Sequence, residues 1–267
     1  MPYKVVLVVY EKPEEADLLT GRLTMAGCEG FEVEDHLLKA YFPKPFSAQK
    51  LQQPLQGFSY QIQELPDQNW NALWESNYPP VMIDDFCSIR ADFHPPLAPA
   101  KYELLIHPHS SFGTGHHATT RMMIGWMRGL EIRGQRVLDF GTGTGILAIL
   151  AAKMGASAVT GLEIDPVALD NARDNIRKND TPMVRLLPDT DQIPAQDRYG
   201  VILANINRNT LIDSAAWLSE HLAPGGRLVL SGFLGADTEA MTQAFRQVGR
   251  TPMGVLSEGS WQAWQLG

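Results

Sequence analysis

A glycine-rich segment in the second half of the chain has the residue types of a nucleoside-binding loop. Asp139-Phe-Gly-Thr-Gly-Thr-Gly145 lies where a predicted strand ends and a predicted helix begins. Glycines let a backbone turn sharply and approach a ligand closely, and the first turn of a helix offers unpaired N–H groups. Glu163 ends the next predicted strand, where a carboxylate can accept hydrogen bonds from ribose hydroxyls. A tight turn without a ligand is the alternative, which the joint occurrence of these features disfavours.

The spacing of the glycines separates two classes of cofactor. Gly141, Gly143 and Gly145 alternate with single residues, whereas the dinucleotide fingerprint has two residues before its third glycine to fit a pyrophosphate. S-adenosylmethionine has no pyrophosphate. The loop therefore favours a methyltransferase over a nucleotide-dependent oxidoreductase.

Asn205 is the candidate for orienting a substrate. It lies near the end of a predicted strand over 200–206, which we expect beside the strand that ends at Asp139. Two such strand ends flank the switch point where ligands bind in open parallel sheets. The side-chain carbonyl of Asn205 can accept an amine proton without becoming charged. The alternative is that Asn205 caps the next helix, near Arg208-Asn209. No Asp or Glu stands out as a dedicated base, so solvent is the expected proton acceptor.

Four histidines, His107, His109, His116 and His117, fall within a short stretch and raise the question of a metal site. No cysteine or further acidic ligand joins them in a spacing typical of zinc. Methyl transfer from a sulfonium needs no metal. We therefore predict no metal.

Strands and helices alternate from residue 136 onward, which predicts a doubly wound α/β sheet covered on both faces. The expected strands are 136–140, 158–164, 183–187, 200–206 and 227–233, and the expected helices are 146–154, 166–178, 210–221 and 236–247. A terminal hairpin is predicted over 251–256 and 261–266.

The N-terminal part has a different pattern, in the order strand, helix, strand, strand, strand. It predicts a small α+β domain of ferredoxin-like type. The expected domains are 1–66, 67–103 as a proline-rich linker with a short helix and strands, and 104–267 for the cofactor. The linker helix is expected over 67–80, where Trp70 and Trp74 share a face.

Composition excludes several classes of function. The net charge of −8 disfavours direct nucleic-acid binding, which requires Lys and Arg to neutralise phosphates. No apolar stretch is long enough to span a membrane, and the N-terminus does not resemble a signal peptide. The two cysteines, Cys28 and Cys87, have no metal-ligand spacing and are expected to be buried or idle thiols. We expect a cytoplasmic monomer.

Four motifs in order resemble those of a known family: Ser111-Phe-Gly-Thr-Gly-His-His-Ala-Thr-Thr120, the glycine loop, Gly161-Leu-Glu-Ile-Asp-Pro166 and Ala204-Asn-Ile206. Together they resemble the bacterial ribosomal protein L-eleven methyltransferase family, known as PrmA, with a Rossmann-like catalytic domain. The resemblance implies transfer of methyl groups from S-adenosylmethionine to the α-amine and lysine side chains of a ribosomal large-subunit protein. It further implies that residues 1–66 recognise the substrate and that His117, which matches a histidine of the family, shapes the pocket around the cofactor. It also implies the following cofactor contacts: Phe112, Thr114, Thr120, Gly141, Gly143, Gly145, Glu163 and Asn205.

Departures from the family pattern leave open the identity of the molecule that accepts the methyl group. His116, Ala118 and Asn207 replace residues that are usual in the family, and Glu163 replaces an aspartate. The alternatives are an amine methyltransferase for another protein or a small molecule, the oxidoreductase, and a binding module without turnover. Intact Glu163 and Asn205 disfavour the last of these.

Overall fold

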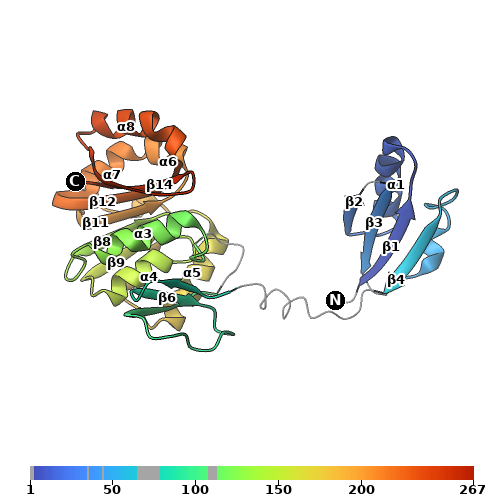
Figure 1. The fold of residues 1–267 in the computed structure, drawn as a ribbon, viewed down its shortest axis with the longest axis horizontal. Helices are drawn as coiled ribbons and strands as arrows, with labels where there is room; N and C mark the ends of the chain where they lie inside the picture. The colour runs from blue at the N-terminus through green and yellow to red at the C-terminus, as the bar shows by residue number, and fades with distance from the viewer. Residues whose placement is uncertain (1–2, 35, 44, 65–78, 108–112) are drawn as a thin grey trace. The chain divides into compact units, whose positions relative to one another are not determined.

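The computed structural model (Figure 1) describes residues 3–34, 36–43, 45–64, 79–107 and 113–267. The chain divides into two compact units, Met1–Tyr78 (unit 1) and Pro79–Gly267 (unit 2). The helix expected over 67–80 lies, apart from its last two residues, outside the described part. The division of the chain into a recognition domain, a linker and a cofactor domain remains a prediction.

The described residues of unit 1 form an antiparallel sheet with one α-helix packed on it. Its strand order is β2-β3-β1-β4, and all neighbours are antiparallel. This is the ferredoxin-like arrangement that the sequence predicts, with a single turn of 3-10 helix in place of the second α-helix. Val6, Leu19 and Phe42 are among its buried side chains. The elements are β1 (Tyr3–Val9), α1 (Pro13–Met25), β2 (Gly30–Glu34), β3 (Leu37–Pro43), η1 (Ala48–Leu51) and β4 (Tyr60–Glu64).

Unit 2 opens with a small sheet of three short strands. These are β5 (Val81–Ile83), β6 (Cys87–Arg90) and β7 (Tyr102–Leu105), in that order. Ile89 and Leu104 are buried in the same hydrophobic cluster as side chains of two helices that cover the large sheet, α3 (Ala118–Arg128) and α4 (Ile146–Lys153). Strands that the sequence analysis assigned to a linker therefore pack on the larger fold.

The large sheet of unit 2 has seven strands in the order β10-β9-β8-β11-β12-β14-β13. Neighbours from β10 to β12 are parallel, and β14 pairs antiparallel with both β12 and β13. The doubly wound sheet and the terminal hairpin are thus confirmed. The strands are β8 (Arg136–Phe140), β9 (Ala158–Leu162), β10 (Val184–Leu187), β11 (Tyr199–Asn205), β12 (Leu222–Leu234), β13 (Pro252–Glu258) and β14 (Trp261–Leu266).

Alternating side chains along the central strands bury both faces of this sheet, as expected for buried strands. Val137 and Leu203 belong to one core with α3 and α4, whereas Leu138 and Ile202 belong to another with α6, α7 and α8. Figure 1 shows the two groups of helices along the sheet. The helices are α3 (Ala118–Arg128), α4 (Ile146–Lys153), α5 (Pro166–Lys178), α6 (Arg208–Asp213), α7 (Ala215–His221) and α8 (Thr238–Gln247).

The helix predicted over 210–221 is in fact two helices. Ser214 is the C-cap of α6 and the N-cap of α7. Serine favours helix caps over interiors, because its hydroxyl competes for backbone hydrogen bonds. Apolar periodicity continues through Ser214, which explains why the pattern alone predicts one helix.

Two further observations concern membranes and metals. None of the helices in the described part of the chain is long and apolar enough to cross a membrane. Among residues 3–34, 36–43, 45–64, 79–107 and 113–267 no group of three His, Cys, Asp or Glu could hold a metal ion. Cys28 and Cys87 are buried free thiols.

The C-terminal hairpin supplies a test of the core. Trp264 is 1% exposed, and its ring lies edge-on to Phe233 with centroids 5.0 Å apart. Trp264→Ala should lower the free energy of unfolding of unit 2 by about 3–5 kcal/mol, because truncating a buried aromatic residue leaves a cavity. Urea unfolding measures the change. The control is Met253→Ala on neighbouring β13, where Met253 is 61% exposed, with an expected change within about 0.5 kcal/mol. Equal losses in the two variants would contradict this account.

Candidate functional site

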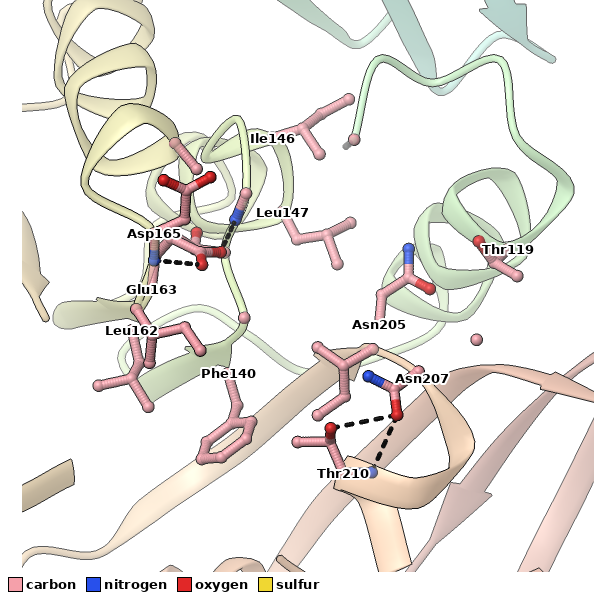
Figure 2. A pocket seen from close by; sticks show the side chains of 18 of the residues that line it. Thr119, Phe140, Ile146, Leu147, Leu162, Glu163, Asp165, Asn205, Asn207 and Thr210 are labelled. Atoms are coloured by element: carbon pink, nitrogen blue, oxygen red, sulfur yellow. Dashed lines mark hydrogen bonds between the residues drawn. The ribbon is translucent and has the colours of Figure 1, made fainter. Parts of the chain in front are cut away.

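A cavity of about 660 Å³ opens at the carboxyl ends of the parallel strands. The strand order changes direction between β8 and β11, and ligands of open parallel sheets bind at such a switch point. Figure 2 shows side chains from both sides of this point converging on the cavity. The lining residues include Gly113, His117, Gly141, Gly143, Leu162, Glu163, Asp165, Asp189, Asn205, Ile206, Asn207, Thr210, Gly232 and Trp261.

The glycine loop follows β8 and forms one wall of the cavity. Its three glycines have φ values of 77°, 54° and 82°, in the left-handed region that favours glycine. A Cβ atom at Gly141 would lie 2.2 Å from Cγ2 of Ile206, so no other residue fits there without displacing Ile206. Gly141 and Gly143 line the cavity, whereas Gly145 is the N-cap of α4 and is not among the lining residues.

Glu163, at the end of β9, joins the glycine loop to the next strand. Its Oε2 accepts a hydrogen bond from the backbone N–H of Gly143 at 3.0 Å, and its Oε1 accepts one from Asp165 at 3.1 Å (Figure 2). A carboxylate has about four lone-pair sites, so acceptor capacity remains for ligand hydroxyls. Glu163 therefore has the position that the sequence predicts and, in addition, organises the loop.

Asn205 ends β11 with one half of its amide bonded and the other half without a partner. Its Nδ2 donates to Oγ1 of the fully buried Thr120 at 3.3 Å. Its Oδ1 is buried and has no hydrogen-bond partner among the described residues. A buried carbonyl without a donor costs free energy, so this oxygen is suited to accept a hydrogen bond from a ligand.

The alternative role for Asn205, capping the next helix, belongs instead to Asn207. Oδ1 of Asn207 accepts hydrogen bonds from the N–H of Thr210 at 3.0 Å and from its hydroxyl at 3.1 Å (Figure 2). Asn207 is the N-cap of α6, a position that asparagine favours. Asn205 is thus left without a structural role for its carbonyl oxygen.

Ile206 holds the turn after β11 in place between two glycines. On one side lies Gly141. On the other, a Cβ atom at Gly232 would lie 2.1 Å from the carbonyl oxygen of Ile206, and Gly232 has a φ of 99°. The backbone N–H of Ile206 donates to the carbonyl of Ser231 at 3.2 Å. This close approach fixes where Asn205 presents its amide.

A family model described as ribosomal protein L11 methyltransferase (PrmA) matches residues 28–266. The chain belongs to this family. It is 39% identical to the ribosomal protein L11 methyltransferase of Porphyromonas gingivalis over 92% of the chain and 89% of that relative. It is 34% identical to that of Bacteroides fragilis over 92% of both proteins. The resemblance inferred from the motifs is confirmed, and PrmA membership disfavours an oxidoreductase.

Solved structures support the fold of unit 2. The ribosomal protein L11 methylase of Lactobacillus delbrueckii subsp. bulgaricus aligns with a TM-score of 0.65 and 23% identity, over 70% of this chain and 97% of that one. A methyltransferase from Pyrococcus furiosus aligns with a TM-score of 0.52 and 21% identity, over 61% and 87%. Both show the Rossmann-like fold expected of a PrmA member.

The start of α3 and the C-terminal hairpin supply another part of the lining in this PrmA chain. His117 is the N-cap of α3 and accepts from the N–H of Thr119 at 3.3 Å. Its ring lies edge-on to Trp261, with centroids 4.8 Å apart. Arg121 forms an ion pair with Glu258 that ties α3 to the hairpin. His117 and Trp261 both line the cavity, which supports the expected role of His117 in shaping the pocket.

Four predicted contacts lie away from the cavity surface or outside the described residues, and Gly145 is one of them. Thr120 is fully buried and reaches the cavity only through Asn205. Oγ1 of Thr114 is 3.2 Å from Nδ1 of His116, and Thr114 is not among the lining residues. Phe112 lies outside the described residues. The cofactor contacts of these residues remain predictions.

Several lining residues escaped the sequence analysis. Asp165 lies in the Gly161–Pro166 motif, so its position beside Glu163 could have been inferred. Gly232 and Trp261 come from strands that are distant in sequence from the glycine loop. Only the order of strands in the sheet brings them to the cavity, and no local pattern reports that order.

Asp139, near the end of β8, forms hydrogen bonds that connect the glycine loop to the first turn of α4. It is buried, and its Oδ2 accepts from the Thr142 hydroxyl at 2.5 Å and from the N–H of Ala148 at 3.1 Å. Because the N-cap Gly145 has no side chain, this carboxyl satisfies a donor in the first turn of α4. Burial raises the pKa of Asp139 to about 7, and the charge of Glu163 adds to this, against the two hydrogen bonds.

The raised pKa of Asp139 predicts a pH dependence of stability. The folded state keeps the proton up to about pH 7, whereas the unfolded state releases it near 3.8, so stability falls as pH rises through this window. Asp139→Asn keeps a carbonyl acceptor and does not titrate. We expect the wild type to lose more free energy of unfolding than this variant between about pH 5 and pH 7, measured by urea unfolding. Parallel pH profiles would mean that Asp139 does not titrate in that window.

Proposed function

We propose that this chain transfers methyl groups from S-adenosylmethionine to amino groups of ribosomal protein L11, including its α-amine and lysine side chains. The observation that carries the proposal is the buried, unpartnered carbonyl oxygen of Asn205, a residue that lines the cavity together with the glycine loop. Membership of the PrmA family supports the acceptor, and the names of the relatives support it further.

The residues of the cavity fit S-adenosylmethionine. Gly141 and Gly143 have no Cβ atom, so a ligand can approach their backbone closely. Glu163 can accept further hydrogen bonds from ribose hydroxyls. When bound, this cofactor supplies a methyl carbon activated by its sulfonium. We assign cofactor binding to Gly141, Gly143, Glu163 and Asn205, with Thr120 acting through Asn205.

Asn205 orients the amine in this proposal. Its Oδ1 accepts one N–H of the acceptor, which directs the nitrogen lone pair toward the cavity. The bond from Nδ2 to Thr120 fixes the amide, so the oxygen has one orientation. Such positioning accelerates a displacement because it removes the entropy of aligning the reactants.

The amine must lose its proton before it can attack. A lysine amine has a pKa of about 10.4 and an α-amine one of about 7.7–8.0, and burial lowers both. The apolar lining, which includes Leu162, Ile206 and Trp261, favours the neutral amine. We assign the remaining acceptor capacity of Glu163 to the ribose hydroxyls of the cofactor, and the proton of the amine to solvent.

The remaining features of the function follow from composition and from the division of the chain. With a net charge of −8, the protein recognises its acceptor without direct nucleic-acid binding. We propose a cytoplasmic monomer in which the N-terminal part recognises the substrate. All the described residues that line the cavity belong to unit 2. Unit 1 is therefore available for recognition of the substrate.

Cofactor affinity tests the assignment of Glu163. Glu163→Ala should weaken binding of S-adenosylmethionine by about ten- to a hundredfold, as expected for a charge-assisted hydrogen bond worth about 1.5–3 kcal/mol. Isothermal titration calorimetry measures the affinity. Glu163→Gln retains one acceptor oxygen and should lose less. Unchanged affinity in Glu163→Ala would remove this residue from the site.

Methylation of unmodified ribosomal protein L11 tests the reaction and its acceptor. With radiolabelled S-adenosylmethionine we expect label on L11 and mass increases in steps of one methyl group. Asn205→Ala should lower kcat by about a hundredfold, since misplacement of a reactant costs that much. The control is Asn209→Ala, an exposed asparagine on α6, with unchanged kcat. Tight cofactor binding without label on L11 would move the acceptor to another protein or a small molecule.

A further inference from the structure

Asp139 is a buried acidic side chain beside the cavity to which the proposed reaction assigns no part. It is 1% exposed and does not line the cavity. Its Oδ2 accepts hydrogen bonds from Thr142 and Ala148, whereas its Oδ1 is buried without a hydrogen-bond partner among the described residues. A negative charge on this carboxyl is therefore only partly compensated, and its protonation state depends on other charges nearby.

Thr142 connects this carboxyl to the cavity. Its hydroxyl donates to Oδ2 of Asp139, and the residue also lines the cavity. Because Thr142 is 4% exposed, little water can enter between the carboxyl and a ligand that contacts this residue. Charges interact more strongly through such a buried layer than through water. A charged group of a ligand in the cavity therefore acts on Asp139 without touching it.

Glu163 shows that a charge in the wall of the cavity acts on Asp139. Burial and, to a smaller extent, the negative charge of Glu163 raise the pKa of Asp139 to about 7, against its two hydrogen bonds. The other groups that bond to Asp139 or pair with it in the sheet are uncharged: Thr142, the N–H of Ala148, Gly161 of β9 and Leu203 of β11. A positive charge in the cavity acts with the opposite sign to Glu163 and favours the ionised carboxyl.

S-adenosylmethionine and its product differ by a single positive charge. The sulfonium of the cofactor is cationic, whereas the thioether of S-adenosylhomocysteine is neutral. Both ligands have the same adenosine, amino and carboxylate groups, so the same walls of the cavity can hold either of them. The charge on sulfur is therefore the difference to which a buried ionisable group beside the cavity responds.

We propose that Asp139 distinguishes the cofactor from its product by charge. When S-adenosylmethionine binds, the carboxyl releases its proton to solvent, and the carboxylate that remains attracts the sulfonium. S-adenosylhomocysteine brings no such charge, so the carboxyl keeps its proton and the product is bound less tightly. The inference rests on the proposed function. Asp139 touches no reacting atom, so it determines specificity and is not a catalytic residue.

Calorimetry in two buffers of different ionisation enthalpy counts the protons released on binding. At about pH 6.5 the wild type should release about half a proton per S-adenosylmethionine, because Asp139 is mostly protonated without the ligand and mostly ionised with it. With S-adenosylhomocysteine the release should be about a tenth of a proton or less. In Asp139→Asn, which cannot titrate, the release on binding the cofactor should fall to this low value. Protons lost by the ligand itself are common to both proteins and cancel in the comparison.

The same titrations give the preference for the cofactor at each pH. From about pH 5.5 to 7.5 the wild type should gain about fivefold in affinity for S-adenosylmethionine relative to S-adenosylhomocysteine, the lower end of usual coupling. At the lower pH the cation must displace the proton of Asp139, whereas at the higher pH the carboxyl is already largely ionised. In Asp139→Asn this ratio of affinities should change by less than about twofold.

A matched control replaces an aspartate away from the cavity. Asp197 forms an ion pair with Arg136 at the opposite end of β8 and does not line the cavity. Asp197→Asn should therefore release protons like the wild type. A further measurement needs no variant, so that a folding defect in Asp139→Asn cannot obscure the test. Infrared difference spectra of the wild type at about pH 6.5 should show loss of the C=O band of a protonated carboxyl with S-adenosylmethionine, and no loss with S-adenosylhomocysteine.

The outcomes distinguish the two proposals. Equal proton release with the two ligands, or equal release on binding the cofactor in the wild type and in Asp139→Asn, would overturn the role of Asp139. An unchanged carboxyl band in a wild type that binds S-adenosylmethionine would do the same. A wild type that binds neither ligand would instead overturn the proposed function.

Discussion

Ile206 lies between two stretches of backbone that approach it more closely than a Cβ atom allows. Gly141 belongs to the glycine loop after β8, and Gly232 belongs to β12. The turn that carries Asn205 is therefore held by strands on both sides of β11. Gly232 contacts the backbone of Ile206 and Gly141 contacts its side chain, and such close packing transmits any shift of one neighbour to the other. The position of the Asn205 amide thus depends on this contact.

Most polar groups around the cavity are already bonded to other parts of the protein. Glu163 holds Gly143, Asn207 caps α6, and Asp139 supports the first turn of α4. These bonds order the loops before a ligand arrives. The Asn205 oxygen differs from them, because its bond must come from outside the described residues. Such a site contributes mainly by holding the reactants in a fixed orientation. This suits a reaction in which the cofactor itself supplies the electrophilic carbon.

The sequence predicted the architecture well where the information is local. Alternating apolar strands and helices indicated the doubly wound sheet, and the glycine loop and Glu163 lie together as expected. The split of the helix at Ser214 was missed, because a cap depends on backbone geometry rather than on apolar periodicity. The sequence left open whether Asn205 orients a substrate or caps the next helix, and only the structure shows that Asn207 is the cap.

The contacts that could not be predicted join residues far apart in the chain. The bond from Thr144 to Gly113, the bonds from Asn175 and Asn179 to the segment after β7, and the arrival of Trp261 at the cavity all depend on strand order. Residue types and spacing do not encode such distances directly. The motifs therefore located the site without showing how its walls are tied together.

The place of β14 in the sheet has a consequence for how the protein is made. Trp261 lines the cavity from the hairpin that pairs with β12, while the glycine loop lies well before it in the chain. During synthesis the loop, Glu163 and Asn205 leave the ribosome first, and β12 must wait with an open edge until the hairpin follows. A nascent chain thus has an incomplete cavity and an exposed strand edge at the same time, and pairing of β14 removes both.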